Sequence, residues 1–292
     1  MEVRAKKALG QHFLTDQDIA RRIVGALQGS PVLEVGPGMG VLTQYLLSRY
    51  CANTSTPLHP LGGLRGVPLR LPESLRSESP DANGGELASE MAVPQLKAIE
   101  IDKESVVYLK KHFPELGDGL IEGDFLKMDL GSVFPGQFSI IGNFPYNISS
   151  QIFFKIIDNR DLVPEVVCMI QKEVAERIAE KPGTKTYGIL SVFLQAWYDI
   201  EYLFTVGSGA FNPPPKVQSA VIRLTRNSRT SLGCDEKLFK TVVKTAFGQR
   251  RKTLRNSLKP LLAGRPADPV FDLRPERLSV EDFIDLTLRL SQ

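Results

Sequence analysis

Short apolar runs alternate with segments of helical periodicity along roughly the first 180 residues of the chain. After Asp16, a residue type that caps helices, apolar side chains recur at helical spacing, so we expect a helix over 16–28. The same patterns predict strands over 32–35, 98–101, 119–124, 138–141 and 166–170, with helices over 41–50, 103–112 and from the last strand through 179. Strands that alternate with helices in this way predict an α/β fold, in which helices cover both faces of a parallel sheet.

The pattern changes in the last quarter of the chain. Residues 219–224 form a further apolar strand, and the residues after it are mainly helical, ending in an amphipathic helix over 280–290. Residues 237–259 contain eight Lys or Arg and no Asp or Glu. We therefore expect two domains, a larger one over 1–228 and a small helical one over 229–292 whose charge favours binding to a nucleic acid.

Residues 51–95 interrupt the alternation. They contain six prolines, five glycines and five serines and show no hydrophobic periodicity, so we interpret them as a flexible insertion. Three arginines against five acidic residues exclude a basic RNA-binding arm. Because the insertion leaves the end of a helix and rejoins the start of a strand, we expect it at the edge of the sheet opposite a ligand site. A contact with a partner is the alternative role.

Composition is that of an ordinary globular protein, with 42% hydrophobic and 24% charged residues and a formal charge of +3. The three cysteines are far apart and form no CxxC pair, so we expect free thiols in a reducing cytoplasm and no metal site. No apolar run approaches the ~18 residues of a membrane span, and no signal-peptide core follows the charged N-terminus. We therefore expect a cytoplasmic protein without a membrane partner.

Glycines and acids follow the predicted strands at the edge where parallel strands end. Residues 34–40 read Glu-Val-Gly-Pro-Gly-Met-Gly, and glycine at Gly36 lets the backbone turn sharply and approach a ligand. Glu100 ends the second strand, where a carboxylate can accept hydrogen bonds from both hydroxyls of a ribose. Asp124 ends the third, where a carboxylate can accept from an adenine amine. A glycine-rich structural turn is the alternative, and nicotinamide and flavin enzymes use similar loops.

The tetrad Asn143-Phe144-Pro145-Tyr146 follows the fourth strand at this same edge. The Asn143 side-chain oxygen and the Pro145 carbonyl can accept the two N–H bonds of an aromatic amine, which would pull the nitrogen toward tetrahedral geometry. Tyr146 offers a ring for an extruded base, and such stacking is worth ~1–3 kcal/mol. A tight Asn-Pro turn is the structural alternative. The tetrad resembles that of amino-methyltransferases with an (N/D/S)-x-P-(Y/F) motif.

Further motifs extend this likeness, and the sequence resembles the KsgA family of small-subunit ribosomal RNA adenine dimethyltransferases. The matching blocks are interrupted only by the insertion and comprise 8–14, 34–40, Leu126, 143–149, 171–175, 187–192, 211–221 and 247–258. The resemblance implies a Rossmann-like class I methyltransferase that uses S-adenosylmethionine. Its implied activity is N6-dimethylation of two adjacent adenosines near the 3′ end of 16S-type RNA during ribosome biogenesis. We expect a monomer whose partner is small-subunit ribosomal RNA or a pre-30S-type particle.

The resemblance also assigns roles to single residues. The segment with His12 and Leu14 would close over the cofactor, and the rest of the cofactor site would be formed by Gly36, Glu100, Asp124 and Asn143. Many relatives carry Asn at the position of His12, and since either side chain can form a hydrogen bond, the departure concerns only that contact and its pH dependence.

Two further features belong to the implied RNA site. Phe211 would supply a second aromatic face for the target base opposite Tyr146, with a place in the core as the alternative. Phosphates would be neutralised by a basic cluster, for which a solvated helix face is the alternative. The cluster consists of Lys244, Arg250, Arg251, Lys252, Arg255 and Lys259.

Three other functions compete with this interpretation. A large-subunit ribosomal RNA adenine methylase shares the tetrad, but the triple proline after Asn212 and the basic C-terminal module argue against it. A non-catalytic ribosome-assembly or transcription factor on the same fold would predict erosion of the cofactor acids or of the tetrad, and both are intact. A nicotinamide oxidoreductase leaves the tetrad unexplained.

Overall fold

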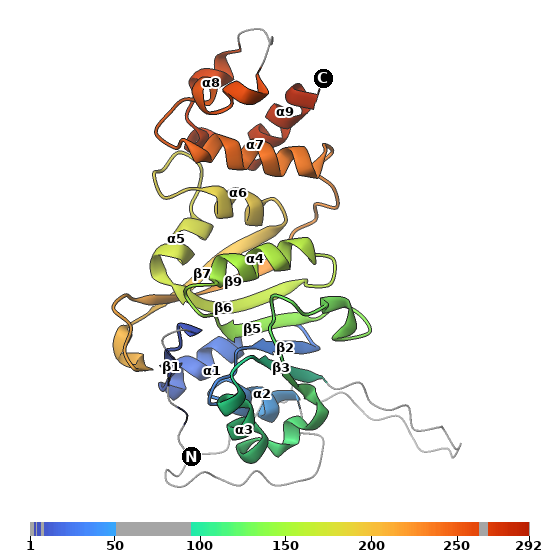
Figure 1. The fold of residues 1–292 in the computed structure, drawn as a ribbon, viewed down its shortest axis with the longest axis vertical. Coiled ribbons are helices and arrows are strands. Elements are labelled where there is room, and N and C mark those ends of the chain that lie inside the picture. The colour runs from blue at the N-terminus through green and yellow to red at the C-terminus, as the bar shows by residue number, and fades with distance from the viewer. Residues whose placement is uncertain (1–2, 4, 7–8, 51–94, 263–267, 292) are drawn as a thin grey trace, which may run out of the picture.

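The computed structural model describes residues 3, 5–6, 9–50, 95–262 and 268–291 (Figure 1). Its centre is a seven-stranded sheet in the order β4-β3-β2-β5-β6-β9-β7. The strands are β2 (Val32–Val35), β3 (Leu96–Glu100), β4 (Leu120–Glu122), β5 (Ser139–Asn143), β6 (Glu165–Gln171), β7 (Tyr198–Val206) and β9 (Ser219–Arg226). All five strands predicted in the first 170 residues are present, and helices flank the sheet, which confirms the α/β class.

The sheet is mixed, whereas the sequence predicted a parallel one. The strands from β4 to β6 pair in parallel, but β9 runs antiparallel to β6, and β7 runs antiparallel to β9. Residues 207–218, which join β7 to β9, contain a 3-10 turn and β8 but no α-helix to carry the chain back along the sheet, and such a connection favours antiparallel pairing of the two strands. Strand β7 was missed because it lies at the edge with many half-exposed positions and lacks a buried apolar run.

Helices cover both faces of this sheet. The described α-helices are α1 (Gln17–Ala26), α2 (Thr43–Tyr50), α3 (Lys103–His112), α4 (Ser149–Asp158), α5 (Lys172–Ala179), α6 (Ile189–Gln195), α7 (Glu236–Gly248), α8 (Leu254–Ser257) and α9 (Val280–Ser291). Short 3-10 turns occupy Pro114–Gly119, Leu130–Ser132, Ser208–Ala210, Lys259–Leu261, Pro269–Asp272 and Pro275–Arg277. The Asp16 side chain accepts from the backbone of Asp18 and Ile19, which confirms the expected cap of α1.

Two hydrophobic cores hold the layers together. Neighbouring side chains of a strand point to opposite faces, so on β6 Val167 belongs to the core that contains residues of α1 and α2, and Cys168 belongs to the core that contains residues of α4 and α5. No helix in the described ranges combines the length and the hydrophobicity needed to cross a membrane.

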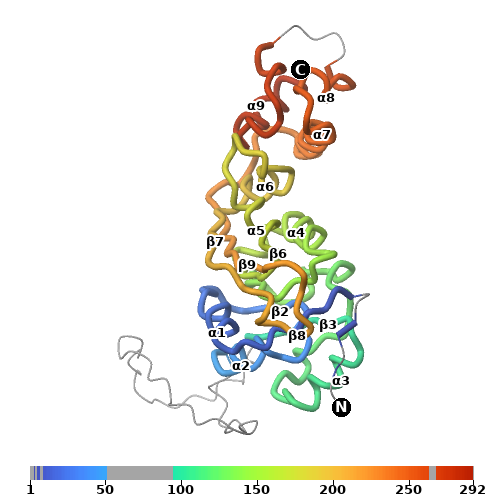
Figure 2. Tube along the Cα trace, turned by 90° about the vertical axis from the view of Figure 1, so that its left-hand side faces the viewer, coloured from blue at the N-terminus to red at the C-terminus, as the bar shows by residue number. Residues whose placement is uncertain are grey.

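The C-terminal helices stack on α6 at the end of the molecule distant from the N-terminus (Figures 1 and 2). Phe193 of α6 packs against Phe239 of α7, with ring centroids 6.1 Å apart, and Phe247 of α7 packs against Phe283 of α9 at 5.8 Å. These rings belong to the same core as the sheet face. A single core thus spans the expected boundary. The division into domains over 1–228 and 229–292 stays a prediction.

A small second sheet joins the N-terminus to the segment between β7 and β9. Its strands are β1 (Phe13–Leu14) and β8 (Phe211–Asn212), which pair antiparallel with Leu14 opposite Phe211. Two segments that are far apart in sequence thus lie side by side. The resemblance assigns residues of the first to the cofactor site and Phe211 of the second to the RNA site.

Residues 51–94, most of the expected insertion, lie outside the described residues. Both flanking residues contact the segment that leads into β2. The Tyr50 hydroxyl donates to the Gly29 carbonyl at 2.9 Å, and the Gln95 carbonyl accepts from the Val32 N–H at 2.8 Å. The insertion therefore leaves and rejoins the fold at the amino-terminal edge of the sheet.

Replacement of residues 51–94 by a short Gly/Ser linker should consequently preserve the fold. We expect the free energy of unfolding to change by at most about 1 kcal/mol, since shortening a loop alters its closure entropy only weakly. Urea denaturation of the full chain and of the deletion variant measures this difference. Loss of a cooperative transition in the variant would show that the insertion is part of the folded core.

Candidate active site

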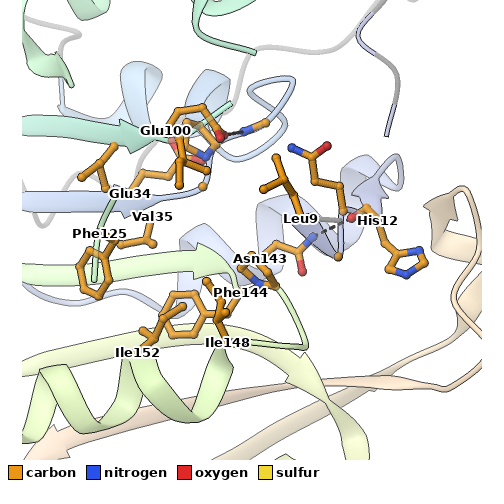
Figure 3. Close-up of a pocket in the computed structure, with 18 of the residues that line it drawn as sticks. Leu9, His12, Glu34, Val35, Glu100, Phe125, Asn143, Phe144, Ile148 and Ile152 are labelled. Atoms are coloured by element: carbon orange, nitrogen blue, oxygen red, sulfur yellow. Dashed lines mark hydrogen bonds between the residues drawn. The ribbon is translucent and has the colours of Figure 1, made fainter. Parts of the chain in front are cut away.

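A cavity of ≈ 290 Å³ opens at the carboxyl ends of β2, β3, β4 and β5 (Figure 3). This volume is close to the ~300 Å³ lower limit of typical small-molecule sites. Five parts of the chain supply most of its lining: residues 9–14, the glycine loop after β2, the end of β3, the residues after β4, and the tetrad that begins at the end of β5. The predicted cofactor residues His12, Leu14, Gly36, Glu100, Asp124 and Asn143 all lie among the lining residues.

The glycine loop leaves room for a ligand on one side and packs tightly on the other. Gly36 has φ +69°, and a Cβ added there would meet no atom within 4 Å. Gly40 has φ +76°, and a Cβ there would lie 2.2 Å from the Phe113 ring. Both positions favour glycine for their backbone conformation. Only Gly36 also exposes its backbone to the cavity.

Glu100 is held rigidly at the end of β3. Its side chain is 3% exposed and accepts from the backbone N–H of Gly38 at 3.0 Å and of Asp102 at 2.9 Å. Burial raises the pKa of this carboxyl, while the two backbone donors lower it. Each carboxylate oxygen keeps acceptor capacity beyond its one bond. At the end of β4, Asp124 accepts from the Leu126 N–H at 2.9 Å and also lines the cavity.

Asn143 is oriented by the N-terminal segment. Its Nδ2 donates to the carbonyl oxygen of His12 at 2.9 Å (Figure 3). Because this bond fixes the amide, the Oδ1 atom is left as an acceptor. The carbonyl oxygen of Pro145 accepts from the Ile148 N–H at 3.2 Å and, having two lone pairs, can take a second bond.

Tyr146 lines the cavity with its hydroxyl anchored. The hydroxyl lies 2.6 Å from Ser219 Oγ at the start of β9. The ring stacks with the imidazole of His12, with centroids 5.5 Å apart and 28° between the planes. His12 Nδ1 donates to the Pro213 carbonyl at 2.9 Å. The structure thus brings His12, Asn143 and Tyr146 together.

The structure does not bring Phe211 to the cavity. Its side chain is 4% exposed, belongs to the core with α1 and α2, and is absent from the lining residues. Its backbone pairs with Leu14 of β1. In this conformation Phe211 is a core anchor and does not face the ring of Tyr146.

Glu34 lines the cavity, and sequence reasoning gave it no role. It is 1% exposed and accepts from the Thr43 hydroxyl at 2.7 Å. Burial, opposed by this hydrogen bond and reinforced by the charge of Glu100, raises the pKa of Glu34 to about 8. An acid inside the apolar run Val-Leu-Glu-Val was the signal that could have identified it.

The basic cluster of the C-terminal helices is only partly free. Arg250 donates to the Tyr187 carbonyl at 2.8 Å, and Arg255 pairs with Asp272 at 2.8 Å. Arg251 and Lys252 are exposed. Within the described ranges, no group of three or more His, Cys, Asp or Glu residues is placed to hold a metal ion.

Comparison with known proteins places these features in a family. The model of the ribosomal RNA adenine dimethylase family matches residues 2–56 and 85–286. Proteins named ribosomal RNA small subunit methyltransferase A are 54% identical in Parabacteroides distasonis, covering 98% of this chain and 94% of the relative, and 53% identical in Cytophaga hutchinsonii, covering 99% and 98%.

Solved structures share the fold. A dimethyladenosine transferase from Plasmodium falciparum aligns with a TM-score of 0.67 at 24% identity, covering 96% of this chain and 98% of that one. The 23S rRNA methyltransferase ErmE aligns with a TM-score of 0.55 at 23% identity, covering 96% and 100%.

The raised pKa of Glu34 predicts a pH-dependent stability. An ordinary carboxyl titrates near pH 4.3 when unfolded, so the folded chain holds the proton more tightly. The contribution of Glu34 to the free energy of unfolding therefore decreases as the pH rises from about 4.5 to about 8. Glu34→Gln mimics the protonated acid and does not titrate. As the pH rises across this window, its free energy of unfolding should therefore increase relative to that of the wild type by on the order of a few kcal/mol.

Urea denaturation at about pH 5, 7 and 8.5 without ligand measures this gain across the titration window. Glu122→Gln, at an exposed position on β4, is the matched control and should follow the wild type. Parallel pH profiles for wild type and Glu34→Gln would contradict the assignment.

Proposed function

Since the chain belongs to the ribosomal RNA adenine dimethylase family, we propose that it dimethylates the N6 amines of two adjacent adenosines near the 3′ end of small-subunit ribosomal RNA. The observation that carries this proposal is the orientation of Asn143. Its amide nitrogen is engaged by the backbone of His12, which leaves an oxygen acceptor at the cavity that would bind a cofactor.

The cavity fits S-adenosylmethionine in the chemistry of its lining. When bound, this cofactor supplies a methyl group activated by a sulfonium. The open backbone at Gly36 admits close approach, Glu100 offers acceptors for ribose hydroxyls, and Asp124 offers an acceptor for the adenine amine. His12 and Leu14 would close the site from the N-terminal side.

The tetrad would prepare the target amine. An exocyclic amine is a weak nucleophile because its lone pair is delocalised into the ring. Asn143 Oδ1 and the Pro145 carbonyl would accept its two N–H bonds and localise that lone pair on the nitrogen. Placement of this kind contributes up to ~7–11 kcal/mol in well-oriented reactions. The methylated nitrogen is cationic and then loses a proton, so the transfer itself requires no general base of raised pKa.

Tyr146 would hold the extruded base by stacking. Its anchored hydroxyl fixes the ring plane, and base–aromatic stacking is worth ~1–3 kcal/mol. In the present structure the imidazole of His12 stacks on this ring. Phe211 would act only after leaving the core, so its proposed role as a second face requires β1 and β8 to rearrange.

The RNA would be bound through phosphates by the exposed basic residues, above all Arg251 and Lys252. We further propose that the protein acts as a monomer in the cytoplasm, on small-subunit RNA or a pre-30S-type particle. The likeness to a large-subunit methyltransferase is one of fold. The relatives more than 50% identical to this chain are named for the small subunit.

Mapping of the modified bases tests this function. The protein is incubated with labelled S-adenosylmethionine and with undermethylated small subunits, large subunits or free RNA. We expect label on two adjacent adenosines of the small subunit.

Asn143→Ala should abolish transfer and retain weakened cofactor binding, because the amine loses its acceptor. Label in large subunits, or near-wild-type turnover of the variant, would contradict the proposal.

The role of the exposed basic residues is tested by Arg251→Ala combined with Lys252→Ala. Each lost phosphate contact should weaken RNA binding and reduce the slope of log K against log salt by about 0.7–0.9. Filter binding over a range of salt concentrations measures the slope. Lys110→Ala with Lys111→Ala, which removes the same charge from exposed positions on α3, should leave it unchanged. An unaltered slope in the first variant would place the RNA face elsewhere.

A further inference from the structure

Part of the cavity wall comes from the N-terminal segment instead of the sheet. Residues 9–14 all line the cavity. With Lys6 they form what we call the strap. In Figure 3 Leu9 and His12 of the strap lie on one side of the cavity and Val35 and Phe125 on the other. A ligand in this cavity would lie against the strap, so a movement of the strap would change how readily the ligand enters or leaves.

One end of the strap is fastened to the tetrad side of the site. Phe13–Leu14 pair with β8, and the His12 carbonyl accepts from Asn143. Gly10 lies so close to the tetrad side that an added Cβ would sit 2.7 Å from Asn147 Oδ1. This end is held by backbone pairing and close packing.

The other end reaches across to the loop between β3 and α3. There the Lys6 ammonium donates to Asp102 and lies 3.1 Å from Glu104 Oε1. The Asp102 side chain is 3% exposed, whereas that of Lys6 is 36% exposed. The Lys6 carbonyl accepts from the Leu9 N–H at 3.0 Å, which ties the ammonium to the turn that enters the cavity wall.

The loop that receives Lys6 also holds Glu100. The Asp102 N–H donates to Glu100 Oε1 at 2.9 Å, and the Asp102 side chain also caps α3. The hydrogen bonds to Asp102 and Glu104 raise the pKa of Lys6. For Asp102, burial raises the pKa, but the bonds from Lys6 and Ser105 outweigh it and lower the pKa. Both partners are therefore charged at neutral pH.

Dimethylation makes exchange of the cofactor part of the reaction. Each adenine nitrogen receives two methyl groups, and each S-adenosylmethionine carries one to give, so spent cofactor must leave and fresh cofactor must enter between transfers. We propose that Lys6 is a positioning residue that fastens the strap across the cavity through Asp102 and Glu104, and so sets the rate at which cofactor is exchanged. This inference rests on the cofactor site of the proposed function.

The experiment measures release of S-adenosylhomocysteine, the demethylated cofactor, from the full chain without RNA. Labelled ligand is bound and then chased with excess unlabelled ligand. Lys6→Met should release it about three- to tenfold faster at low salt, since it loses a partly buried ion pair and a second exposed one. Lys6→Arg keeps the charge and should stay near the wild-type rate.

Two controls distinguish this clasp, the contact of Lys6 with Asp102 and Glu104, from a general effect of charge. Lys103→Met removes an exposed lysine beside Asp102 and should leave release unchanged. At about 1 M salt, where the screening length is about 3 Å, wild type and Lys6→Met should converge. Lys6→Met loses the ion pair that stabilises the charged Asp102 side chain, so we expect a lower thermal unfolding temperature for this variant, and release is measured well below that temperature.

An unchanged release rate in Lys6→Met would overturn the proposal, as would equal acceleration by Lys103→Met or a difference that persists in high salt. Failure of the wild type to bind S-adenosylhomocysteine at all is a different outcome. It would refute the cofactor site itself, and with it the function on which the clasp rests.

Discussion

One hydrogen bond, from Asn143 Nδ2 to the carbonyl oxygen of His12, joins the parts of this site. It connects the end of β5, where the target amine would bind, to the strap that walls the cavity. The bond satisfies a donor that would be costly to leave unpaired in a half-buried place, and it leaves the amide oxygen as an acceptor. One bond thus fixes both the position of His12 in the strap and the orientation of the acceptor.

The edge at which this bond lies contains buried acidic side chains whose burial costs stability. Glu34 and Glu100 are both nearly fully buried beside the glycine loop, and burial raises the pKa of each. Such groups cost stability in the absence of ligand. The two hydrophobic cores supply the compensation and keep the strand ends in place, so the polar groups are positioned before ligand arrives.

Sequence reasoning succeeded where the signal was local. The helix over 103–112 and the strand over 32–35 are found with the predicted bounds, because periodicity and capping residues act within a few positions. The residues predicted to bind the cofactor line one cavity, since the carboxyl ends of parallel strands share an edge. The antiparallel β7, the pairing of Leu14 with Phe211 and the contact of Lys6 with Asp102 depend on distant residues, and no local pattern announces them. For the same reason Phe211 was expected at the target base and is instead found in the core.

In the proposed mechanism Asn143 and Pro145 accept hydrogen bonds from both N–H groups of the target adenine. A crystal structure with S-adenosylhomocysteine and a short RNA that carries the target adenosines would show whether these bonds form. We expect the N6 nitrogen at about 2.7–3.2 Å from both Asn143 Oδ1 and the Pro145 carbonyl oxygen. An N6 nitrogen beyond about 3.5 Å from these atoms, or an Asn143 amide that presents its Nδ2 to the base, would contradict it.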